Sequence, residues 1–584
     1  MPDILKALTN IVSSAFAECG YDEKSGIVTP SDRLDLCQFQ CNGAFAASKI
    51  YKKPPFVIAE EVAAVVARHE LFESAELCKP GFINMTLKDE ALLKLASDSA
   101  NDAHLGIPQE KAETVILDYG GANVAKPLHI GHLRSAIIGE SLKRIAQTMG
   151  LKVVGDVHMG DWGLQIGLVI AELRERNPDW ACFSDGFNTG DKLSVALNVD
   201  ELNEIYPTAS KKSKEHEQFK ETARRITAEL QSGHAGYMAL WREIMHVSVE
   251  DLRKNYGALG IEFELWLGES DAEQYVPELL NILTEKNLLI ESQGAMVVDV
   301  SDPDDKAEMP PVIIKKSDNS SIYATTDLAT IIQRQRDFAP GKIWYVVDKR
   351  QSLHFTQVFR CAKKAGLVPE GTELEHAGFG TMNGSDGKPY KTRDGGVMRL
   401  DDFMNQITEA AYDKMNAREF ENEGQKLDTA KKVAVAAIKF GDLSNHRLKD
   451  YVFDIDKFLS FEGKTGTYLL YTVTRINSIL KKVGYESETP EFTGIYSGIE
   501  REIYLYSILM GETFRHAVEE KAPSFICDGA YRLAQLFSQF YHDNRISNEQ
   551  DEAKKTSWLS LCIFVRKMLV KHLDALGIET VEVM

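Results

Sequence analysis

The fold is indicated most clearly by the stretch Lys126-Pro-Leu-His-Ile-Gly-His-Leu-Arg134. An apolar strand pattern at residues 115–118 and a loop rich in glycine precede it, and helical periodicity over residues 130–149 follows and stops at Gly150. A second strand pattern covers residues 152–158. Strand, loop, helix and strand at this spacing predict a parallel α/β sheet, in which ligands bind where a strand's carboxyl end turns into a helix.

Two histidines at the start of the predicted helix point to phosphate chemistry. His129 and His132 are three residues apart and share one side of the first turn. The free N–H groups of a helix N-terminus bind phosphate, and Gly131 lets a nucleotide approach the backbone closely. Histidines at this spacing are by themselves more often surface residues. Lys126 and Pro127 beside them, at a strand-to-helix crossover, favour a site for phosphate or a metal.

Length and composition limit the class of protein. The chain has 584 residues, well beyond the ~250–300 at which single cores stop growing, so several domains are expected. Hydrophobic residues make up 44% and charged residues 26%, which excludes a disordered or fibrous chain. The net charge of −20 argues against a uniformly basic nucleic-acid-binding surface, although a local basic stripe can still contact RNA.

The sequence predicts a cytoplasmic protein. No stretch reaches the ~18 apolar residues that a membrane helix needs, and the N-terminal apolar residues recur at helical spacing without a preceding basic segment. The eight cysteines are scattered and never form Cys-x-x-Cys. This favours free thiols in a reducing compartment over structural zinc, and no protein-bound metal is expected.

Patterns along the chain predict three domains. Residues 1–110 mix short helices and strands in a small α+β domain. Residues 111–400 form the Rossmann-type domain, interrupted by a charged helical insertion over about 177–260, with further sheet strands expected at 312–315 and 343–347. After residue 400 strands become scarce, which predicts an all-α bundle over residues 401–584.

The signature stretch also carries a family resemblance. His129-Ile-Gly-His132 matches the signature of class I aminoacyl-tRNA synthetases and their nucleotidyltransferase relatives, and the wider stretch Asn123-Val-Ala-Lys-Pro-Leu-His-Ile-Gly-His-Leu-Arg-Ser-Ala-Ile-Ile-Gly139 resembles the arginyl-tRNA synthetase version. Gly160-Asp-Trp-Gly-Leu-Gln165 and Tyr323-Ala-Thr-Thr-Asp327 resemble later blocks of that family. The resemblance extends from about residue 30 to the C-terminus.

The resemblance implies a reaction and its partners. Members of the family join L-arginine to ATP as arginyl-adenylate, transfer the arginyl group to tRNA(Arg), and release pyrophosphate and AMP. ATP with Mg²⁺ is then a substrate complex, and no tightly bound cofactor is expected. The resemblance further implies that the N-terminal domain meets the tRNA elbow and that the helical domain meets the anticodon. The protein is expected to be a monomer.

The same resemblance assigns residues to ATP and to catalysis. The ATP-binding set is Lys126, His129, Gly131, His132, Met382 and Lys391, and the catalytic set is Lys126, His129, His132, Lys388 and Lys391. The family's second signature, Lys-Met-Ser-Lys-Ser, is absent, and a loop over residues 387–396 stands in its place. That loop is either a phosphate clamp or an ordinary solvated turn. Lys126, just before the first signature, takes the position of the lysine that many arginyl enzymes use instead.

Arginine and tRNA are assigned further residues. The predicted arginine-binding set is Asp118, Asn123, Tyr323, Asp327 and Gln351. Gly120-Gly-Ala122 replaces the family's usual Ser-Pro before Asn123, so the role of this asparagine is the weakest of the set. Arg475 and Tyr541 are predicted to contact tRNA, whereas most other aromatic residues of the helical domain, including Phe537 and Phe540, are expected in its core.

Two alternatives remain open at this stage. One is a class I synthetase for another amino acid, or a nucleotidyltransferase that does not use tRNA. The helical C-terminal region speaks against a nucleotidyltransferase, and the acidic pocket candidates speak against a synthetase for an apolar amino acid. The other is a binding paralogue that has lost catalysis, but both signature histidines and the nearby lysines are present.

Overall fold

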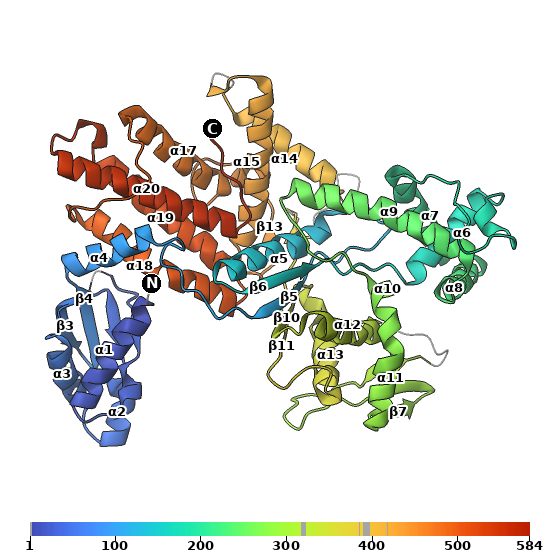
Figure 1. Ribbon diagram of the computed structural model, residues 1–584, viewed down its shortest axis with the longest axis horizontal. Helices are drawn as coiled ribbons and strands as arrows, with labels where there is room; N and C mark the ends of the chain where they lie inside the picture. Colours follow the sequence, from blue (N-terminus) through green and yellow to red (C-terminus); the bar gives the residue numbers. More distant parts are fainter. Residues whose placement is uncertain (1–2, 35, 317–322, 385, 389–397, 417–418) are drawn as a thin grey trace.

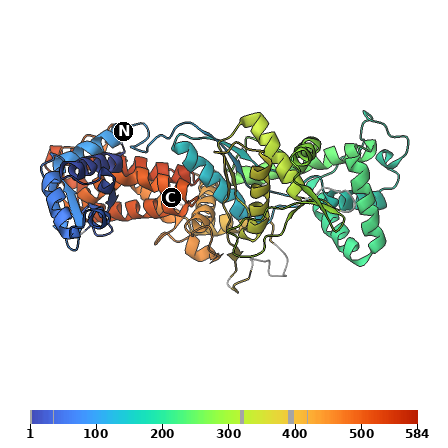
Figure 2. The same ribbon diagram turned by 90° about the horizontal axis from the view of Figure 1, so that it is seen from below.

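The computed structural model describes residues 3–34, 36–316, 323–384, 386–388, 398–416 and 419–584 (Figure 1). The molecule is elongated, with the N-terminal and helical domains at one end, the insertion at the other, and the parallel sheet between them (Figure 2). The predicted fold class, a parallel sheet with helices and a helical C-terminal domain, is confirmed.

The N-terminal domain is an antiparallel sheet covered by helices. Its strands β1 (Val28–Pro30), β2 (Phe39–Cys41), β3 (Phe72–Cys78) and β4 (Phe82–Leu87) lie in the order β1-β2-β4-β3, and its helices are α1 (Ile4–Glu18), α2 (Ala44–Tyr51) and α3 (Pro55–Val66). In β4 every second residue is buried, among them Ile83 and Met85, because successive side chains of a strand point to opposite faces.

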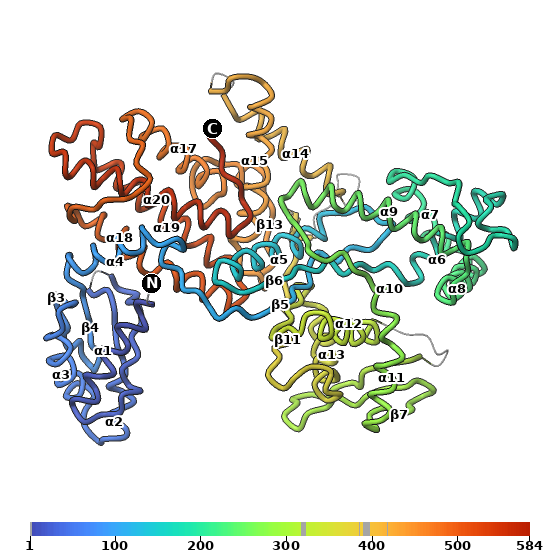
Figure 3. The backbone as a smooth tube through the Cα atoms, in the orientation of Figure 1, coloured from blue at the N-terminus to red at the C-terminus, as the bar shows by residue number. Residues whose placement is uncertain are grey.

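Helix α4 (Asp89–Asn101) joins this domain to the rest of the molecule. It packs against α18 (Gly498–Glu519), where Arg501 forms an ion pair with Asp89. The linker from α4 to the parallel sheet then follows α18, and Gly511 lets Pro108 approach that helix closely (Figure 3).

The central sheet contains four parallel strands in the order β11-β10-β5-β6. They are β5 (Thr114–Asp118), β6 (Lys152–Asp156), β10 (Lys342–Tyr345) and β11 (Glu373–His376). The chain leaves β5 toward β6 on one side, whereas β10 lies on the other side. In open parallel sheets ligands bind in a crevice at the carboxyl ends beside such a reversal, and here Asp118 aligns with both Tyr345 and Asp156.

Helix α5 (Ile130–Thr148) connects β5 to β6 and is the predicted signature helix. It ends as expected at Gly150, whose φ of +90° suits a residue without a side chain. Gly139 brings the helix against the ring of Tyr119, because a Cβ atom there would lie 2.2 Å from that ring. The close approach fixes the helix over the strand that carries the candidate site.

The insertion is helical, in agreement with the charged helical pattern of the sequence. After α6 (Leu164–Arg176) it contains α7 (Val199–Glu215), α8 (Glu217–Gln231) and α9 (Ala235–Ala258). The chain then returns beside β6, where Asp156 bridges Leu265 and Met159 bridges Gly268 in parallel fashion. The short helix α10 (Glu269–Ala272) starts at this point, followed by α11 (Val276–Glu285).

One predicted strand lies in a different sheet. Strand β9 (Val312–Lys315) pairs antiparallel with β8 (Ala295–Val298), which pairs with β7 (Leu289–Ser292), so the prediction that it continues the parallel sheet is wrong. A short apolar run fits either kind of sheet, and periodicity alone does not distinguish them. The two helices that follow, α12 (Tyr323–Phe338) and α13 (Ser352–Ala365), do flank the parallel sheet.

The C-terminal region is a bundle of long helices. They are α14 (Leu400–Lys414), α15 (Glu423–Leu443), α17 (Gly466–Val483), α18, α19 (Ser524–Asp543) and α20 (Glu552–Ala575), and the short helix α16 (Ile455–Phe458) lies between α15 and α17 in the chain. Helix α5 packs against α15, α18 and α20, so the signature helix belongs to the core of both domains (Figure 1). Within the described residues, no helix is long and apolar enough to span a membrane.

Candidate active site

Two loops meet at the N-terminus of α5. The Ile130 N–H donates to Met398 O at 3.2 Å, and the Leu400 N–H donates to Leu128 O at 3.0 Å. Residues 398–400 directly follow the loop that replaces the second family signature. Residues 398–400 are therefore held against the first signature.

The helix cap fixes which nitrogen of each signature histidine carries hydrogen. Nδ1 of His129 accepts the Gly131 N–H at 3.0 Å, and Nδ1 of His132 accepts the His129 N–H at 3.2 Å. In a neutral imidazole the other nitrogen must then hold the proton. Each ring thus offers one Nε2–H donor, and the two rings lie close together, with centroids 3.9 Å apart.

Both histidines are neutral near pH 7. Burial lowers the pKa of His129, with a further contribution from the Lys126 charge. Burial and the adjacent His129 ring lower the pKa of His132 to about 3. The pair therefore presents neutral, oriented donors rather than cations, and it does so at a helix end that already favours anions.

The predicted ATP-binding residues differ in exposure and in their contacts. The Lys126 ammonium lies 4.5 Å from the centre of the Tyr206 ring, a contact across to the insertion. Gly131 is exposed, and a side chain there would collide with the His129 ring. Met382 is 6% exposed, so its main chain is what it offers to a nucleotide.

The predicted loop lysines are only partly described. Lys388 is exposed, and its N–H donates to Asp386. Lys391 lies outside the described residues.

A cluster of acids lies beyond the carboxyl end of β6. Asp161 accepts the N–H and the hydroxyl of Ser270 at 3.0 and 2.5 Å, and Asp327 contacts His354 Nε2 at 2.5 Å. Burial and the nearby carboxylates of Asp161 and Asp327 raise the pKa of Glu269 to about 8. Acids crowded in this way favour a cationic ligand, since a guanidinium would relieve their repulsion.

Asp118 is engaged by the protein itself. Arg334 Nη2 donates to Asp118 and to Asp156, each at 2.6 Å, and this arginine is 1% exposed. Asp118 therefore has an internal guanidinium partner, which sets it apart from Asp327 in the predicted arginine-binding set. Among the described residues, Asp118, Asp156 and His158 form the group spaced closely enough to hold a metal, but Arg334 already supplies positive charge to it.

The structure also describes the other predicted arginine ligands. Asn123 Oδ1 accepts Gln165 Nε2 at 2.7 Å, which leaves its amide group as the donor that it can offer to a ligand. Tyr323 is 68% exposed at the start of α12, and Gln351 is exposed at the start of α13. Asp327 lies on α12, one helical turn after Tyr323, and does not directly follow a strand of the parallel sheet.

Comparison with known proteins identifies the whole chain. Residues 94–455 match the family described as tRNA synthetases class I (R), catalytic domain; residues 469–584 match the DALR anticodon binding domain; and residues 3–87 match the arginyl tRNA synthetase N terminal domain. The arginine–tRNA ligase of Agathobacter rectalis is 49% identical, with 99% of both chains covered, and that of Alkaliphilus oremlandii is 48% identical, with 100% of both covered.

The chain belongs to the arginyl-tRNA synthetase family. The predicted family and enzyme class, and the charging of tRNA with arginine, are thereby confirmed. The fold of the arginyl-tRNA synthetase from Plasmodium falciparum is similar over 100% of both chains, with a TM-score of 0.81 and 25% identity. The Thermus thermophilus enzyme shows the same fold, with a TM-score of 0.80 and 22% identity over 100% of both chains.

The predicted tRNA residues of this synthetase lie together in the helical domain. The Arg475 guanidinium lies 4.4 Å from the centre of the Tyr541 ring, and both residues line a cavity of about 370 Å³ with Lys482, His542 and Arg545. Phe537 and Phe540 are buried, as expected for core residues.

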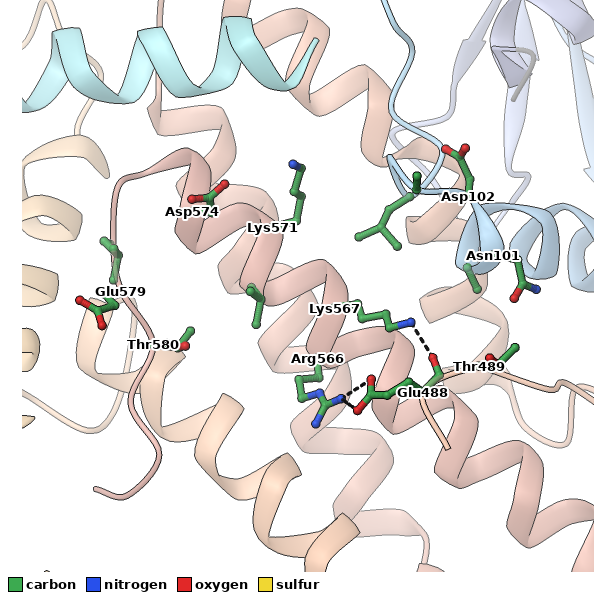
Figure 4. A pocket seen from close by; sticks show the side chains of 15 residues that line it. Asn101, Asp102, Glu488, Thr489, Arg566, Lys567, Lys571, Asp574, Glu579 and Thr580 are labelled. Atoms are coloured by element: carbon green, nitrogen blue, oxygen red, sulfur yellow. Dashed lines mark hydrogen bonds and ion pairs between the residues drawn. The ribbon is translucent and has the colours of Figure 1, made fainter. Parts of the chain in front are cut away.

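A wider cavity lies elsewhere, between the end of α4 and α20 (Figure 4). Its volume is about 850 Å³, and no predicted site residue lines it. Two of its cations are bound within the protein, since Arg566 donates twice to Glu488, at 2.7 and 2.8 Å, and Lys567 donates to the Glu488 carbonyl at 2.6 Å. We therefore place the chemistry at the sheet edge.

Several residues of the site escape sequence reasoning. Glu269 follows no motif and reaches the acid cluster only because Gly268 pairs with Met159. Arg334 stands among Gln333, Gln335 and Arg336, so the sequence of α12 gives no sign that this arginine forms a buried ion pair. Tyr206 lies in the insertion, where a tyrosine on a charged helix indicates packing alone.

Proposed function

We propose that this synthetase divides its reaction between the two sides of the crevice. The observation that carries the proposal is the pair of neutral Nε2–H donors of His129 and His132 at a helix N-terminus, together with the crowded carboxyl groups of Asp161, Glu269 and Asp327. ATP binds on the histidine side and L-arginine on the acid side. The arginine carboxylate then attacks the α-phosphate, and pyrophosphate leaves.

The ATP side works by positioning and by donors directed at developing charge. His129 and His132 donate to phosphate oxygens in the transition state, where oriented neutral donors in a partly buried site are most effective. Lys126, with Lys388 and Lys391 of the following loop, holds the leaving pyrophosphate. Mg²⁺ arrives with ATP, bound to its phosphates, and neutralises part of their charge.

The arginine side works by charge and by hydrogen bonds. Glu269 and Asp327 accept the guanidinium, since a carboxylate can take two of its N–H groups. Asn123 holds the α-amino or carboxylate end, and Tyr323 and Gln351 border the side-chain pocket. Asp118 is bound to Arg334 within the protein. It supports the structure of the site and does not bind the substrate directly.

The tRNA spans the elongated molecule. Arg475 and Tyr541 contact the anticodon region through charge and base stacking. The N-terminal domain contacts the tRNA elbow. We further propose a cytoplasmic monomer in which tRNA must be bound before arginine is activated.

The test is ATP–pyrophosphate exchange with each of the twenty amino acids, with and without total tRNA. Exchange with arginine alone, and only in the presence of tRNA, is expected. Arginyl-adenylate formed without tRNA would contradict the order of binding, and exchange with another amino acid would contradict the pocket. Asp327→Asn should raise the KM for arginine and leave the KM for ATP unchanged, and equal effects on both would remove Asp327 from the pocket.

A further inference from the structure

The insertion holds the loops of the active site through polar contacts. Its side chains bind the main chain of these loops: the Tyr256 hydroxyl donates to Gly120 O at 2.6 Å, Gln231 Nε2 to Trp162 O at 2.8 Å, and Trp241 Nε1 to Asp161 O at 3.0 Å. Residues 120 and 161–162 flank the crevice from β5 and β6. The insertion therefore sets the shape of the site, although it contributes none of the signature residues.

The insertion contacts the main chain of the residue before Lys126 and the side chain of Lys126 itself. The residue before it, Ala125, has a φ of +62° in the left-handed region, and its N–H donates to Ser248 Oγ of α9 at 3.1 Å. The Lys126 ammonium lies 4.5 Å from the centre of the Tyr206 ring of α7. Both the direction in which the chain presents Lys126 and the position of its charge thus depend on the insertion.

The Tyr206 ring is a suitable partner for a lysine that binds phosphate. A lysine has a long stem with many rotamers, and fixing it in one place costs conformational entropy. An aromatic face attracts an ammonium without neutralising it, whereas a carboxylate would compete with phosphate for the charge. Tyr206 also lies close enough to Tyr323 to contribute, after burial and Glu269, to the raised pKa of that phenol. Its ring therefore lies at the boundary between the phosphate and arginine sides.

We infer that Tyr206 is a positioning residue for Lys126, which holds the ammonium where the phosphates of ATP will bind. The inference rests on the proposed role of Lys126 in binding phosphate. The helical insertion thereby completes the ATP site of a sheet that lacks the usual second signature. Tyr206 acts through Lys126 and makes no contact with the reacting atoms.

The test is ATP–pyrophosphate exchange by the full chain with saturating arginine and tRNA. Tyr206→Leu should lower kcat/KM for ATP about tenfold, a magnitude within the range of a partly desolvated cation–π contact. Tyr206→Phe keeps the aromatic face and should stay within about twofold of the parent enzyme. The KM for arginine should not change. Tyr206→Met serves as a second ring-deleting variant if the leucine variant folds poorly.

A double mutant separates positioning from a structural role. In a Lys126→Met background, Tyr206→Leu should cause no further loss, because the group that it positions is gone. Tyr496→Leu is the matched control, since its ring also carries a lysine, Lys554 at 5.7 Å, in the helical domain. The control should leave exchange unchanged.

The outcomes distinguish the inference from the proposed function. If Lys126→Met exchanges as fast as the parent enzyme, the proposed role of Lys126 fails and the inference fails with it. If Lys126→Met is impaired but Tyr206→Leu is not, the inference alone is overturned. It is also overturned if the two losses multiply in the double mutant, because Tyr206 would then act independently of Lys126.

Discussion

Two helical regions hold the catalytic sheet, and they do so by different means. The insertion bonds to main-chain atoms of loops, as Trp241 does to Asp161 O and Tyr256 to Gly120 O. The helical domain instead binds α5 through buried side chains. Arg134 Nε lies 3.0 Å from Asp442 Oδ2, with both side chains at most 3% exposed, and the Tyr451 hydroxyl donates to the same carboxylate at 2.9 Å.

These two kinds of contact should affect stability and activity differently. A buried ion pair strongly destabilises a fold when one partner is removed, because the other charge is left without compensation. A hydrogen bond to a loop carbonyl contributes little to folding but fixes where reacting groups lie. We therefore expect changes on the helical-domain side to act on unfolding, and changes on the insertion side to act on kinetics.

The largest effect is expected for Asp442→Ala. Removal of this carboxylate leaves Arg134 buried, and the free energy of unfolding should fall by about 3–5 kcal/mol, measured by denaturant titration. Asp574→Ala is the control on the same interface. The Asp574 side chain, which pairs with Arg144, is 56% exposed, so this pair should contribute less than about 1 kcal/mol to the free energy of unfolding. Equal losses in the two variants would show that burial does not decide the strength of this interface.

The next effect is expected between the two regions, at the N-terminus of α5. His132→Ala removes a donor to the transition state and should lower arginine activation by roughly 10²-fold. The affinity for tRNA, measured by filter binding, should remain nearly unchanged. A parallel loss of tRNA affinity would assign His132 to the structure of the domain and not to the chemistry.

A smaller effect concerns the pH dependence of arginine binding. Glu269 has a pKa of about 8, so its carboxyl is protonated in the free enzyme below that pH. A bound guanidinium favours the carboxylate, and arginine binding therefore releases a proton. The KM for arginine should fall as the pH rises from about 6.5 and should level off above about 8, by at most about tenfold per pH unit.

The matched variant for this pH dependence is Glu269→Gln. It removes the titrating group and should make the KM for arginine nearly independent of pH over that range. A parent enzyme with a flat profile would remove Glu269 from the pocket.

The smallest effect is expected for Trp241→Phe, which tests the insertion side directly. Phenylalanine keeps a ring against Trp162, whose centroid lies 5.4 Å from that of Trp241, but loses the donor to Asp161 O. The net loss should be about 0.5–1.5 kcal/mol, seen as a roughly 2- to 10-fold fall in kcat/KM for arginine. An unchanged kcat/KM with a lowered unfolding energy would reverse the division drawn above.

The elements with local signals could be predicted from the sequence. Helix α5 follows from apolar periodicity that stops at Gly150, and β5 and β6 follow from apolar runs bounded by loops. The position of β9 could not be predicted, because the same short pattern serves parallel and antiparallel sheets. The signature histidines were recognised as a pair, but their hydrogen-bonded cap, which sets their tautomers, is visible only in three dimensions.

The pocket was less predictable than the fold, because its charges are paired over long distances in sequence. Arg334 lies 216 residues from Asp118, and no local pattern links them. Glu269 joins the acid cluster through the return of the chain beside β6. Sequence reasoning finds acids by their place in a motif, whereas the structure shows which of them already have an internal partner.

The contacts between α5 and the end of the last helix also affect when the protein can finish folding during its synthesis. Ser141 of α5 donates to Ala575 O at 3.0 Å across 434 residues, and Lys439 donates to Gly577 O at 2.6 Å. At roughly 5–20 residues per second, the ribosome needs on the order of 20–90 s to supply these partners after α5 has been synthesised. A nascent chain thus carries its signature histidines long before their helix is fully packed. The packing of the signature helix is therefore completed only at the end of translation.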